Sequence, residues 1–264
     1  MGVLNVTPDS FSDGGSLFAR RAVDVDKVLY RAEEMLTEGA DLLDIGGEST
    51  RPGAVPPSED EEIERVMPAL IALTRRFDVP VSVDTSSGAL MRLAAEAGAA
   101  LVNDVRALRK PGALEAAVEI GLPVVLMHMA GEPESMQDAP AYINVAHEVT
   151  DFLMDRVAVC EAAGIERNRL ILDPGFGFGK TLEHNVALFR ALPDLKRLGF
   201  PLLIGVSRKR MVGALLGKPV AARVFGSVAL AMLAAQQGVD LIRVHDVGAT
   251  VDCLTVLARV TESE

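Results

Sequence analysis

The sequence has 264 residues, of which 49% are hydrophobic and 24% charged, so it can bury the core of one α/β domain. Its formal net charge of −11 argues against binding to nucleic acid or to an anionic membrane surface. The longest apolar stretches are too short to span a bilayer and no basic leader opens the chain, so we expect a cytoplasmic protein whose single domain covers residues 1–264.

Short runs rich in Val, Leu and Ile alternate along the chain with longer segments of helical period. Strands are predicted at residues 2–5, 41–45, 80–84, 101–103, 124–128, 170–173, 202–205 and 241–244. Helices are predicted at residues 23–38, 58–77, 88–97, 112–120, 143–163, 183–192, 221–237 and 251–260. Eight strands that alternate with helices predict a (β/α)8 TIM barrel, with its active site at the carboxyl ends of the strands.

Two local patterns agree with these helices. Ser58 followed by Glu61 is a capping-box pattern, which supports the predicted start of the second helix. Cys160 and Cys253 both fall in helical segments among apolar neighbours. We therefore expect two reduced thiols in the core and neither a disulfide nor a metal pair.

Polar residues stand at or just past the carboxyl end of each predicted strand. In chain order they are Asn5, Asp44, Asp84, Asn103, His128, Asp173, Ser207 and His245. Because the carboxyl ends of barrel strands meet at one face, these side chains are expected to converge on one pocket. A single residue of this kind is more simply explained by a hydrogen bond to a neighbouring loop, but that explanation is hard to extend to all eight.

The glycine-rich sequence DPGFGFGKT at residues 173–181 follows the sixth predicted strand. Glycine lets the backbone approach a ligand closely, and Phe176 and Phe178 are costly to expose unless they cover something, which favours a flat, partly apolar ligand. The letters GKT at residues 179–181 match the end of a P-loop. Pro174 stands where that motif requires its first glycine, so a nucleotide-phosphate site is not expected.

Cations in two other loops predict an anion site. Arg51 lies in the sequence GGESTRPG after the second strand, and Arg243 and His245 lie at the end of the eighth. The fork of an arginine suits phosphate or carboxylate, and this part of a barrel often holds phosphate. The three residues together are therefore expected to form a local anion site within an acidic protein.

A second basic cluster, at residues 207–210, follows the seventh strand. A helix that starts there would aim free N–H groups at a second anion, with Lys209 turned inward. Arg208 and Arg210 can instead belong to a solvated surface, and the sequence leaves both possibilities open.

The acceptors Asp84, Asn103 and Asp173 favour a different kind of contact. Inward-facing carboxylates and amides need donors, which predicts a ligand with several N–H groups in one plane, such as a fused nitrogen heterocycle. These oxygens could instead hold Mg²⁺, yet no His-x-His or Glu-x-x-His spacing marks a dedicated metal site. Met127 is expected to form part of the pocket wall.

Eight motifs spread over the whole chain resemble those of the dihydropteroate synthase family. They are MGVLNVTPDSFSDGG (1–15), DIGGESTRPG (44–53), SVDTS (82–86), NDV (103–105), LMHM (126–129), DPGFGFGKT (173–181), SRK (207–209) and RVHDV (243–247). The resemblance implies a barrel enzyme that joins 6-hydroxymethyl-7,8-dihydropterin diphosphate to the amine of p-aminobenzoate, giving 7,8-dihydropteroate and diphosphate in bacterial folate synthesis. It also implies Mg²⁺ and a homodimer.

The resemblance also implies roles for residues that match the motifs. The pterin-holding positions are Asp84, Asn103, Asp173 and Lys209, with Arg243 packed over the ring. The diphosphate positions are Asn5, Arg51, Arg243 and His245, of which Asn5 is also the magnesium ligand. The p-aminobenzoate positions are Thr50, Pro52, Phe178, Ser207 and residue 210, with Phe11 on a first loop that closes over them. Further substrate-binding positions are Asp44, Met127 and Gly205, and the catalytic positions are Asp84, Asp173, Lys209, Arg243 and His245.

The sequence departs from the family pattern in two respects. Arg210 stands where some relatives have serine, in the surroundings expected for the benzoate carboxylate. The chain also begins at its first predicted strand, whereas relatives usually carry residues before it that cover the bottom of the barrel. We therefore expect a truncated start or a misassigned start codon, with more effect on stability than on chemistry.

Two alternatives to a dihydropteroate synthase are considered. Methyltetrahydrofolate-binding methyltransferases have a similar pterin barrel but do not use a diphosphate site, so the motifs STRPG and SRK disfavour them. A catalytically silent paralogue that only binds pterin is expected to have lost Arg51, Phe178 or Lys209, and all three residues are present.

Overall fold

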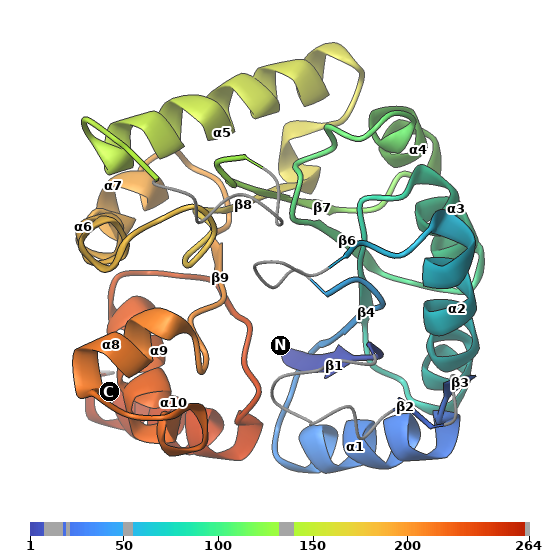
Figure 1. Ribbon diagram of the computed structural model, residues 1–264, viewed down its shortest axis with the longest axis horizontal. Coiled ribbons are helices and arrows are strands. Elements are labelled where there is room, and N and C mark those ends of the chain that lie inside the picture. Colours follow the sequence, from blue (N-terminus) through green and yellow to red (C-terminus); the bar gives the residue numbers. More distant parts are fainter. Residues whose placement is uncertain (8–17, 20–21, 50–54, 132–139, 262–264) are drawn as a thin grey trace.

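The computed structural model describes residues 1–7, 18–19, 22–49, 55–131 and 140–261. Its strands and helices alternate in the predicted order, and the helices surround the strands (Figure 1). The parallel strands are β1 (Gly2–Asn5), β4 (Leu43–Gly46), β5 (Val81–Asp84), β6 (Leu101–Asp104), β7 (Val124–Met127), β8 (Leu170–Asp173), β9 (Leu203–Ile204) and β10 (Leu241–Ile242). A short antiparallel hairpin, β2 (Phe18–Ala19) with β3 (Ala22–Val23), precedes the first helix.

The eight predicted helices begin within about four residues of the expected positions, and the short helices α7 and α8 were not among them. They are α1 (Val25–Thr37), α2 (Glu59–Arg76), α3 (Gly88–Glu96), α4 (Ala113–Ile120), α5 (Val145–Ala162), α6 (Leu182–Arg190), α7 (Leu192–Lys196), α8 (Arg210–Leu216), α9 (Val224–Gln236) and α10 (Val247–Thr261). Ser58 and Glu61 form the predicted capping box, in which each side chain binds the other residue's backbone N–H group. No helix in the described ranges combines the length and apolar character needed to cross a membrane.

The strands follow one another around a ring that consists of two sheets. The larger sheet is parallel and has the order β1-β4-β5-β6-β7-β8, and the smaller pairs β9 with β10. Single parallel bridges join the two sheets, Gly2 with Val244 on one side and Leu172 with Leu202 on the other. The predicted TIM-barrel class is confirmed, although the continuous ladders do not close the ring.

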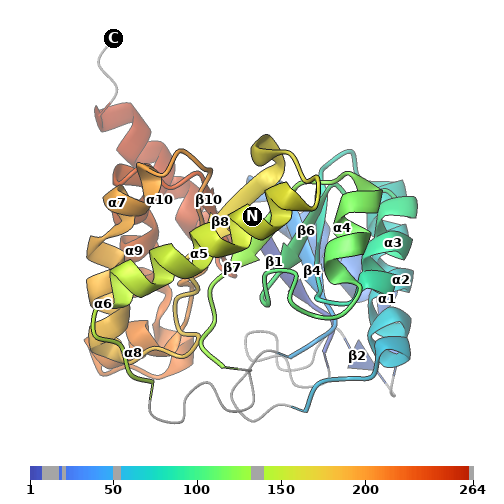
Figure 2. The ribbon, with the colours of Figure 1, turned by 90° about the horizontal axis from the view of Figure 1, so that it is seen from above.

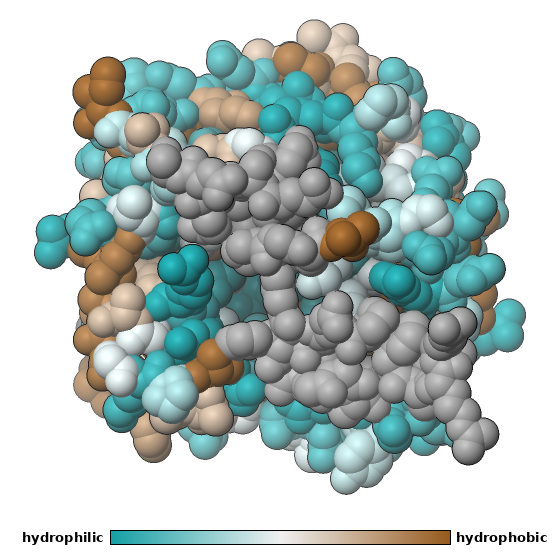
Figure 3. Space-filling model, viewed as in Figure 1, coloured by the Kyte–Doolittle hydropathy of each residue, from teal (hydrophilic) through white to brown (hydrophobic). Residues whose placement is uncertain are grey.

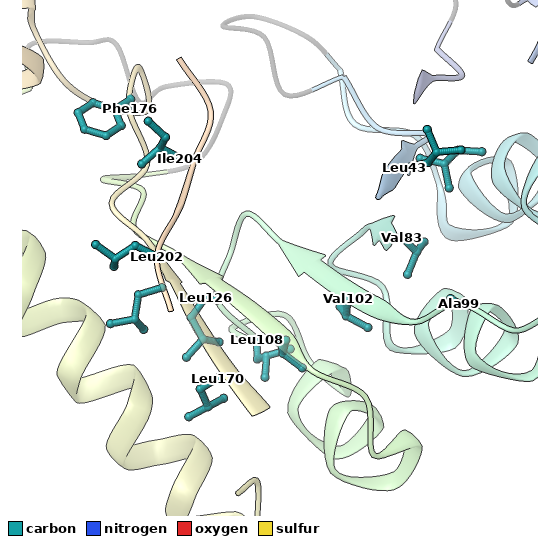
Figure 4. Packing of buried hydrophobic residues seen from close by; sticks show 14 of the residues in the cluster. Leu43, Val83, Ala99, Val102, Leu108, Leu126, Leu170, Phe176, Leu202 and Ile204 are labelled. Carbon is teal, nitrogen blue, oxygen red and sulfur yellow. The ribbon is translucent and has the colours of Figure 1, made fainter. Parts of the chain in front are cut away.

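Successive strand residues face opposite sides of the sheet, and this alternation separates two cores. Leu43, Val83, Val102 and Leu126 point outward and join the main core between strands and helices (Figure 4). In the view turned by 90°, α2, α3 and α4 lie outside β4 and β6 (Figure 2). A smaller cluster is formed by buried residues of the other parity, namely Leu101, Val125 and Leu203.

Candidate active site

The strand register brings several predicted site residues together. Asp84 lies opposite Asn103 at the ends of β5 and β6, and Met127 lies opposite Asp173 at the ends of β7 and β8. Asp44 is deeper in the barrel, because it pairs with Ser82, two residues before Asp84. Viewed as in Figure 1, the surface is hollowed near its centre, where hydrophilic residues are visible (Figure 3).

Arg243 connects two of these carboxylates. Its Nε atom donates to Oδ2 of Asp44 at 2.6 Å, and its Nη2 atom donates to Oδ2 of Asp84 at 2.9 Å. The side-chain amide of Asn103 also donates to Oδ2 of Asp44, at 3.2 Å. The other oxygen of Asp44, Oδ1, is buried and has no hydrogen-bond partner among the described residues, so it remains available as an acceptor at the floor of the site.

The ion pairs with Arg243 do not fully offset the free-energy cost of burying the charged carboxylates. Burial raises the pKa of Asp84; the attraction of Arg243 opposes that shift, and the repulsion of Asp44 adds to it. Arg243 stays charged: burial alone lowers its pKa, but Asp44 and Asp84 together raise it. One cation thus serves two carboxylates, and the centre favours an additional donor or a proton.

Asp173 and Lys209 form a second polar group. The Asp173 carboxylate accepts from the N–H group of Gly175 at 2.7 Å. Burial raises its pKa, against the attraction of Lys209. The Lys209 side chain turns inward, where its Nζ atom donates to the carbonyl oxygen of Phe176 at 2.5 Å and lies 4.6 Å from the centre of the Phe178 ring. Burial lowers the pKa of Lys209 to about 8.

The two phenylalanines of the glycine-rich loop after β8 have different environments. Phe176 is fully buried and packs against Phe189, with 5.7 Å between ring centres, so the expectation that it covers a ligand is wrong. Phe178 is partly exposed and packs against the small buried cluster of Val105, Met127 and Met129. Gly175 has φ +68°, and a Cβ atom there would lie 1.9 Å from the carbonyl oxygen of His128. The loop therefore lies directly on the chain after β7, which requires glycine at this position.

His245 and Ser207 come together from the loops after β10 and β9. The hydroxyl oxygen of Ser207 lies 3.2 Å from Nδ1 of His245 and accepts from its backbone N–H group at the same distance. Burial, with the repulsion of Arg243, lowers the pKa of His245 to about 3. The ring is therefore neutral at pH 7 and offers one N–H donor.

The two arginines of the basic cluster at residues 207–210 have different environments. Arg208 has a positive φ of 56° and pairs with Asp246, whose Oδ2 atom lies 2.9 Å from its Nε atom. Arg210 is exposed and begins α8, the helix start considered for this cluster. The surface alternative thus holds for Arg210, whereas Arg208 links the loops after β9 and β10.

The remaining predicted site residues have these positions. Asn5 ends β1 and is partly exposed, and its side chain has no hydrogen-bond partner among the described residues. A Cβ atom at Gly205 would lie 3.8 Å from Nζ of Lys209 and from Cβ of Arg243, so this glycine leaves room between them. Four residues predicted to bind substrate lie outside the described ranges, namely Phe11, Thr50, Arg51 and Pro52.

Sequence reasoning missed two buried polar pairs beside the site, although His128, a member of the second pair, was predicted at a strand end. Arg106 donates to both carboxylate oxygens of Glu48, at 2.6 and 3.0 Å, and both side chains are about 5% exposed. Lys180 contacts His128 through Nζ and Nδ1, 2.8 Å apart. The sequence feature that could have indicated these pairs is that Glu48, His128 and Lys180 lie inside the family motifs and Arg106 directly follows one. The predicted core thiols are free cysteines in α5 and α10, but only Cys160 is buried and Cys253 is partly exposed.

Comparisons with known proteins agree on one family. The profile of the pterin binding enzyme family matches residues 1–245. The dihydropteroate synthase of Haemophilus influenzae is 51% identical over 256 residues, which are 97% of this chain and 91% of that protein.

Solved structures extend the similarity to the fold. The crystal structure of Yersinia pestis dihydropteroate synthase with a sulfonamide drug complex has a TM-score of 0.96 and 52% identity, and the match covers 100% of this chain and 94% of that one. The Xanthomonas albilineans dihydropteroate synthase in complex with 7,8-dihydropteroate has a TM-score of 0.88 and 48% identity, with 100% and 94% covered. The chain therefore belongs to the pterin binding enzymes and, within them, to the dihydropteroate synthases.

Proposed function

We propose that this chain, folded as one domain, condenses 6-hydroxymethyl-7,8-dihydropterin diphosphate with p-aminobenzoate to 7,8-dihydropteroate and diphosphate. The observation that carries the proposal is the convergence of Asp84, Asn103 and Asp173 at the ends of three strands, with Lys209 and Arg243 beside them. The acceptors suit the N–H groups of a pterin, and the cations suit an anionic leaving group. The Xanthomonas relative supports the proposal, because its structure contains 7,8-dihydropteroate.

The pterin ring is proposed to lie between Asp173 and Arg243. Asp173 is buried and carries one hydrogen bond from its own loop, which leaves acceptor capacity for ring N–H groups. Asp84 and Asn103 provide an acceptor and an amide on the opposite side. Met127 and the partly exposed ring of Phe178 provide the apolar wall that a flat ligand requires.

The diphosphate is proposed to bind near Asn5, Arg51 and His245, with Arg243 between it and the ring. His245 is neutral and is oriented by Ser207, so it donates a hydrogen bond without adding a full positive charge. p-Aminobenzoate is proposed to lie near Phe178 and Ser207, on the side of Lys209 away from the pterin. At the diphosphate site, Arg51 is proposed to provide the positive charge that the neutral His245 does not.

Magnesium is proposed to accompany the diphosphate. Among the described residues no group of three His, Cys, Asp or Glu side chains could hold a metal ion. Mg²⁺ does not need such a group, because it usually keeps several waters and binds through one or two protein oxygens and the substrate phosphates. The amide oxygen of Asn5, partly exposed and without a partner among the described residues, fits that mode. When bound, the ion would supply neutralisation of the charge on the leaving group.

We propose that the leaving group departs before the amine attacks. The C–O bond of the pterin methylene breaks, diphosphate leaves with the electron pair, and Arg51, Arg243 and His245 stabilise its charge. The cation on the methylene is conjugated with the dihydropterin ring, and the nearby carboxylates of Asp84 and Asp173 favour positive charge there. The amine nitrogen then forms the C–N bond and loses its proton to solvent.

Water must be kept away from this cation, because it would form the alcohol in place of dihydropteroate. The loops that carry Phe11 and Pro52 are proposed to close once diphosphate is in place, which excludes water and completes the p-aminobenzoate site. Aniline-type amines are neutral at pH 7, so no general base is required to start the reaction.

The direct test mixes the purified protein with dihydropterin diphosphate, p-aminobenzoate and Mg²⁺ and detects product by mass spectrometry. The proposal predicts 7,8-dihydropteroate and diphosphate in equal amounts. Binding of the pterin substrate without product would indicate the catalytically silent paralogue. Omission of Mg²⁺ in a parallel reaction is expected to slow turnover while leaving binding of the free pterin unchanged.

We also propose that the chain acts as a homodimer, as the family resemblance implies. Large apolar side chains are exposed on the last three helices, which supports a covered surface there. They are Leu215 and Leu216 on α8, Phe225 and Leu233 on α9, and Val256 and Val260 on α10. Light scattering is expected to give twice the chain mass of 28.0 kDa, and Phe225→Asp should shift that mass toward the monomer.

A further inference from the structure

Lys180 is a buried amine to which the proposed reaction gives no role. Its side chain is 4% exposed. The Nζ atom lies 2.8 Å from Nδ1 of His128 and donates to the carbonyl oxygens of Gly175 and Phe178 at 2.9 and 3.0 Å. Three acceptors match the three donors of an ammonium group, although burial, opposed by the attraction of Asp173, still lowers the pKa of Lys180 to about 7.

These acceptors lie in two different loops of the candidate site. His128 follows β7, whereas Gly175 and Phe178 belong to the loop between β8 and α6. The two loops are also in backbone contact, because a Cβ atom at Gly179 would lie 2.8 Å from the carbonyl oxygen of Ala130. Lys180 therefore holds the β8–α6 loop against the chain that follows β7.

The same loop determines where Phe178 and Lys209 lie. The backbone N–H group of Phe178 donates to Gly175 at 3.1 Å and its carbonyl accepts from Lys180, while its ring remains partly exposed. The carbonyl of Phe176, in the middle of the loop, accepts from Lys209. Lys180 thus fixes the loop from the barrel side, and Lys209 contacts it from the side of the site.

We propose that Lys180 is a positioning residue for the aromatic amine substrate. By holding the backbone around Phe178, it places this ring beside Lys209 as one wall of the p-aminobenzoate site. The inference rests on the proposed function. The contact of Asp173 with a pterin depends less on Lys180, because Asp173 ends β8 and its backbone is held by the ladder with β7.

The test compares Lys180→Met with Lys218→Met, the same substitution at an exposed lysine. For Lys180→Met the KM for p-aminobenzoate should rise roughly tenfold, because the contacts of Nζ with His128, Gly175 and Phe178 are lost, while kcat changes less. The Kd for dihydropterin diphosphate, measured by calorimetry, should stay within about twofold of the unmodified protein. Lys218→Met should match the unmodified protein in all three constants.

The possible failures can be told apart. If the unmodified protein makes no dihydropteroate, the proposed function fails and this inference fails with it. If the unmodified protein is active but Lys180→Met leaves the KM for p-aminobenzoate unchanged, or weakens pterin binding equally, only the positioning role is overturned.

His128 gives a second measurement in case Lys180→Met does not fold. Asparagine at position 128 can offer an oxygen acceptor in place of Nδ1, whereas leucine cannot. His128→Leu should therefore raise the KM for p-aminobenzoate by about threefold or more, and His128→Asn should stay near the original value. Equal KM values for the two variants would contradict the proposed contact. Where Lys180→Met folds, adding His128→Leu to it should bring no further loss.

Discussion

The Nε atom of Arg243 lies 2.6 Å from Oδ2 of Asp44, although 199 residues separate the two along the chain. The same guanidinium reaches Asp84, and both carboxylates face into the barrel, Asp84 at the end of β5 and Asp44 deeper. Arg243 therefore has two functions in the proposed enzyme. It is the counter-ion of the two buried carboxylates and is available to the substrate as a cation.

Removal of Arg243 should cost stability as well as activity. Arg243→Met leaves Asp44 and Asp84 without their cation, which is expected to lower the free energy of unfolding by roughly 3 kcal/mol. Adding Asp84→Asn should restore part of that loss, because one of the uncompensated carboxylates is removed. Urea denaturation of the single and double variants measures both effects. An unchanged midpoint for Arg243→Met would show that the ion pairs contribute no net stability.

Asp173 should dominate pterin affinity. Asp173→Asn places an amide donor where the carboxylate accepts, which should weaken binding of 6-hydroxymethyl-7,8-dihydropterin by about 2 to 4 kcal/mol. Calorimetry measures the effect, with Asp155→Asn, an exposed position on α5, as the matched control. Near-normal affinity in Asp173→Asn would remove this residue from the pterin site.

Stability should fall as the pH decreases below 6.5. Burial and the neighbouring Lys180 lower the pKa of His128 from 6.5 to about 3. Between these values the unfolded chain binds a proton that the folded chain does not, so acid favours unfolding. The thermal midpoint is expected to decrease between pH 6.5 and 4, with a smaller decrease in His128→Asn. Identical pH profiles for the two proteins would show that His128 does not contribute to the acid sensitivity.

Varying the basicity of the amine tests whether the C–O bond breaks before the C–N bond forms. In the dissociative scheme, substituents on p-aminobenzoate that change the basicity of the amine but leave its carboxylate intact should hardly affect the single-turnover rate of C–O cleavage. Rapid-quench measurement of diphosphate release provides that rate. A steep dependence on amine basicity would mean that the amine displaces the leaving group directly, and the scheme would have to be abandoned.

The regular part of the fold was predictable because strand and helix patterns are local. The bounds predicted for β1 and β8 agree with the structure, and Ser58 marked the start of α2 correctly. The short helix α7 was missed and α8 was considered only as a helix start, since five and seven residues show too little helical period. The sequence also could not predict which of Phe176 and Phe178 faces the core, because that depends on the turns of a glycine-rich loop.

The predicted site residues were found through their positions at strand ends, but their partners were not. The pairing of Arg243 with Asp44 depends on closure of the ring, which brings together residues from opposite ends of the chain. Arg208 appeared either as an anion ligand or as a surface residue, whereas its partner is Asp246, 38 positions further on. Sequence spacing contains no signal for such long-range pairs.

Substrate binding is expected to stabilise the junction between the two sheets. Lys209 and Arg243 follow β9 and β10, whereas Asp84 and Asp173 end strands of the larger sheet, and single bridges join the sheets on either side. A pterin bound by residues of both sheets would link the two sheets across that junction. Amide hydrogens beside the bridges, at residues 202 and 244, should then exchange with deuterium more slowly in the complex, because opening of the junction would require release of the ligand.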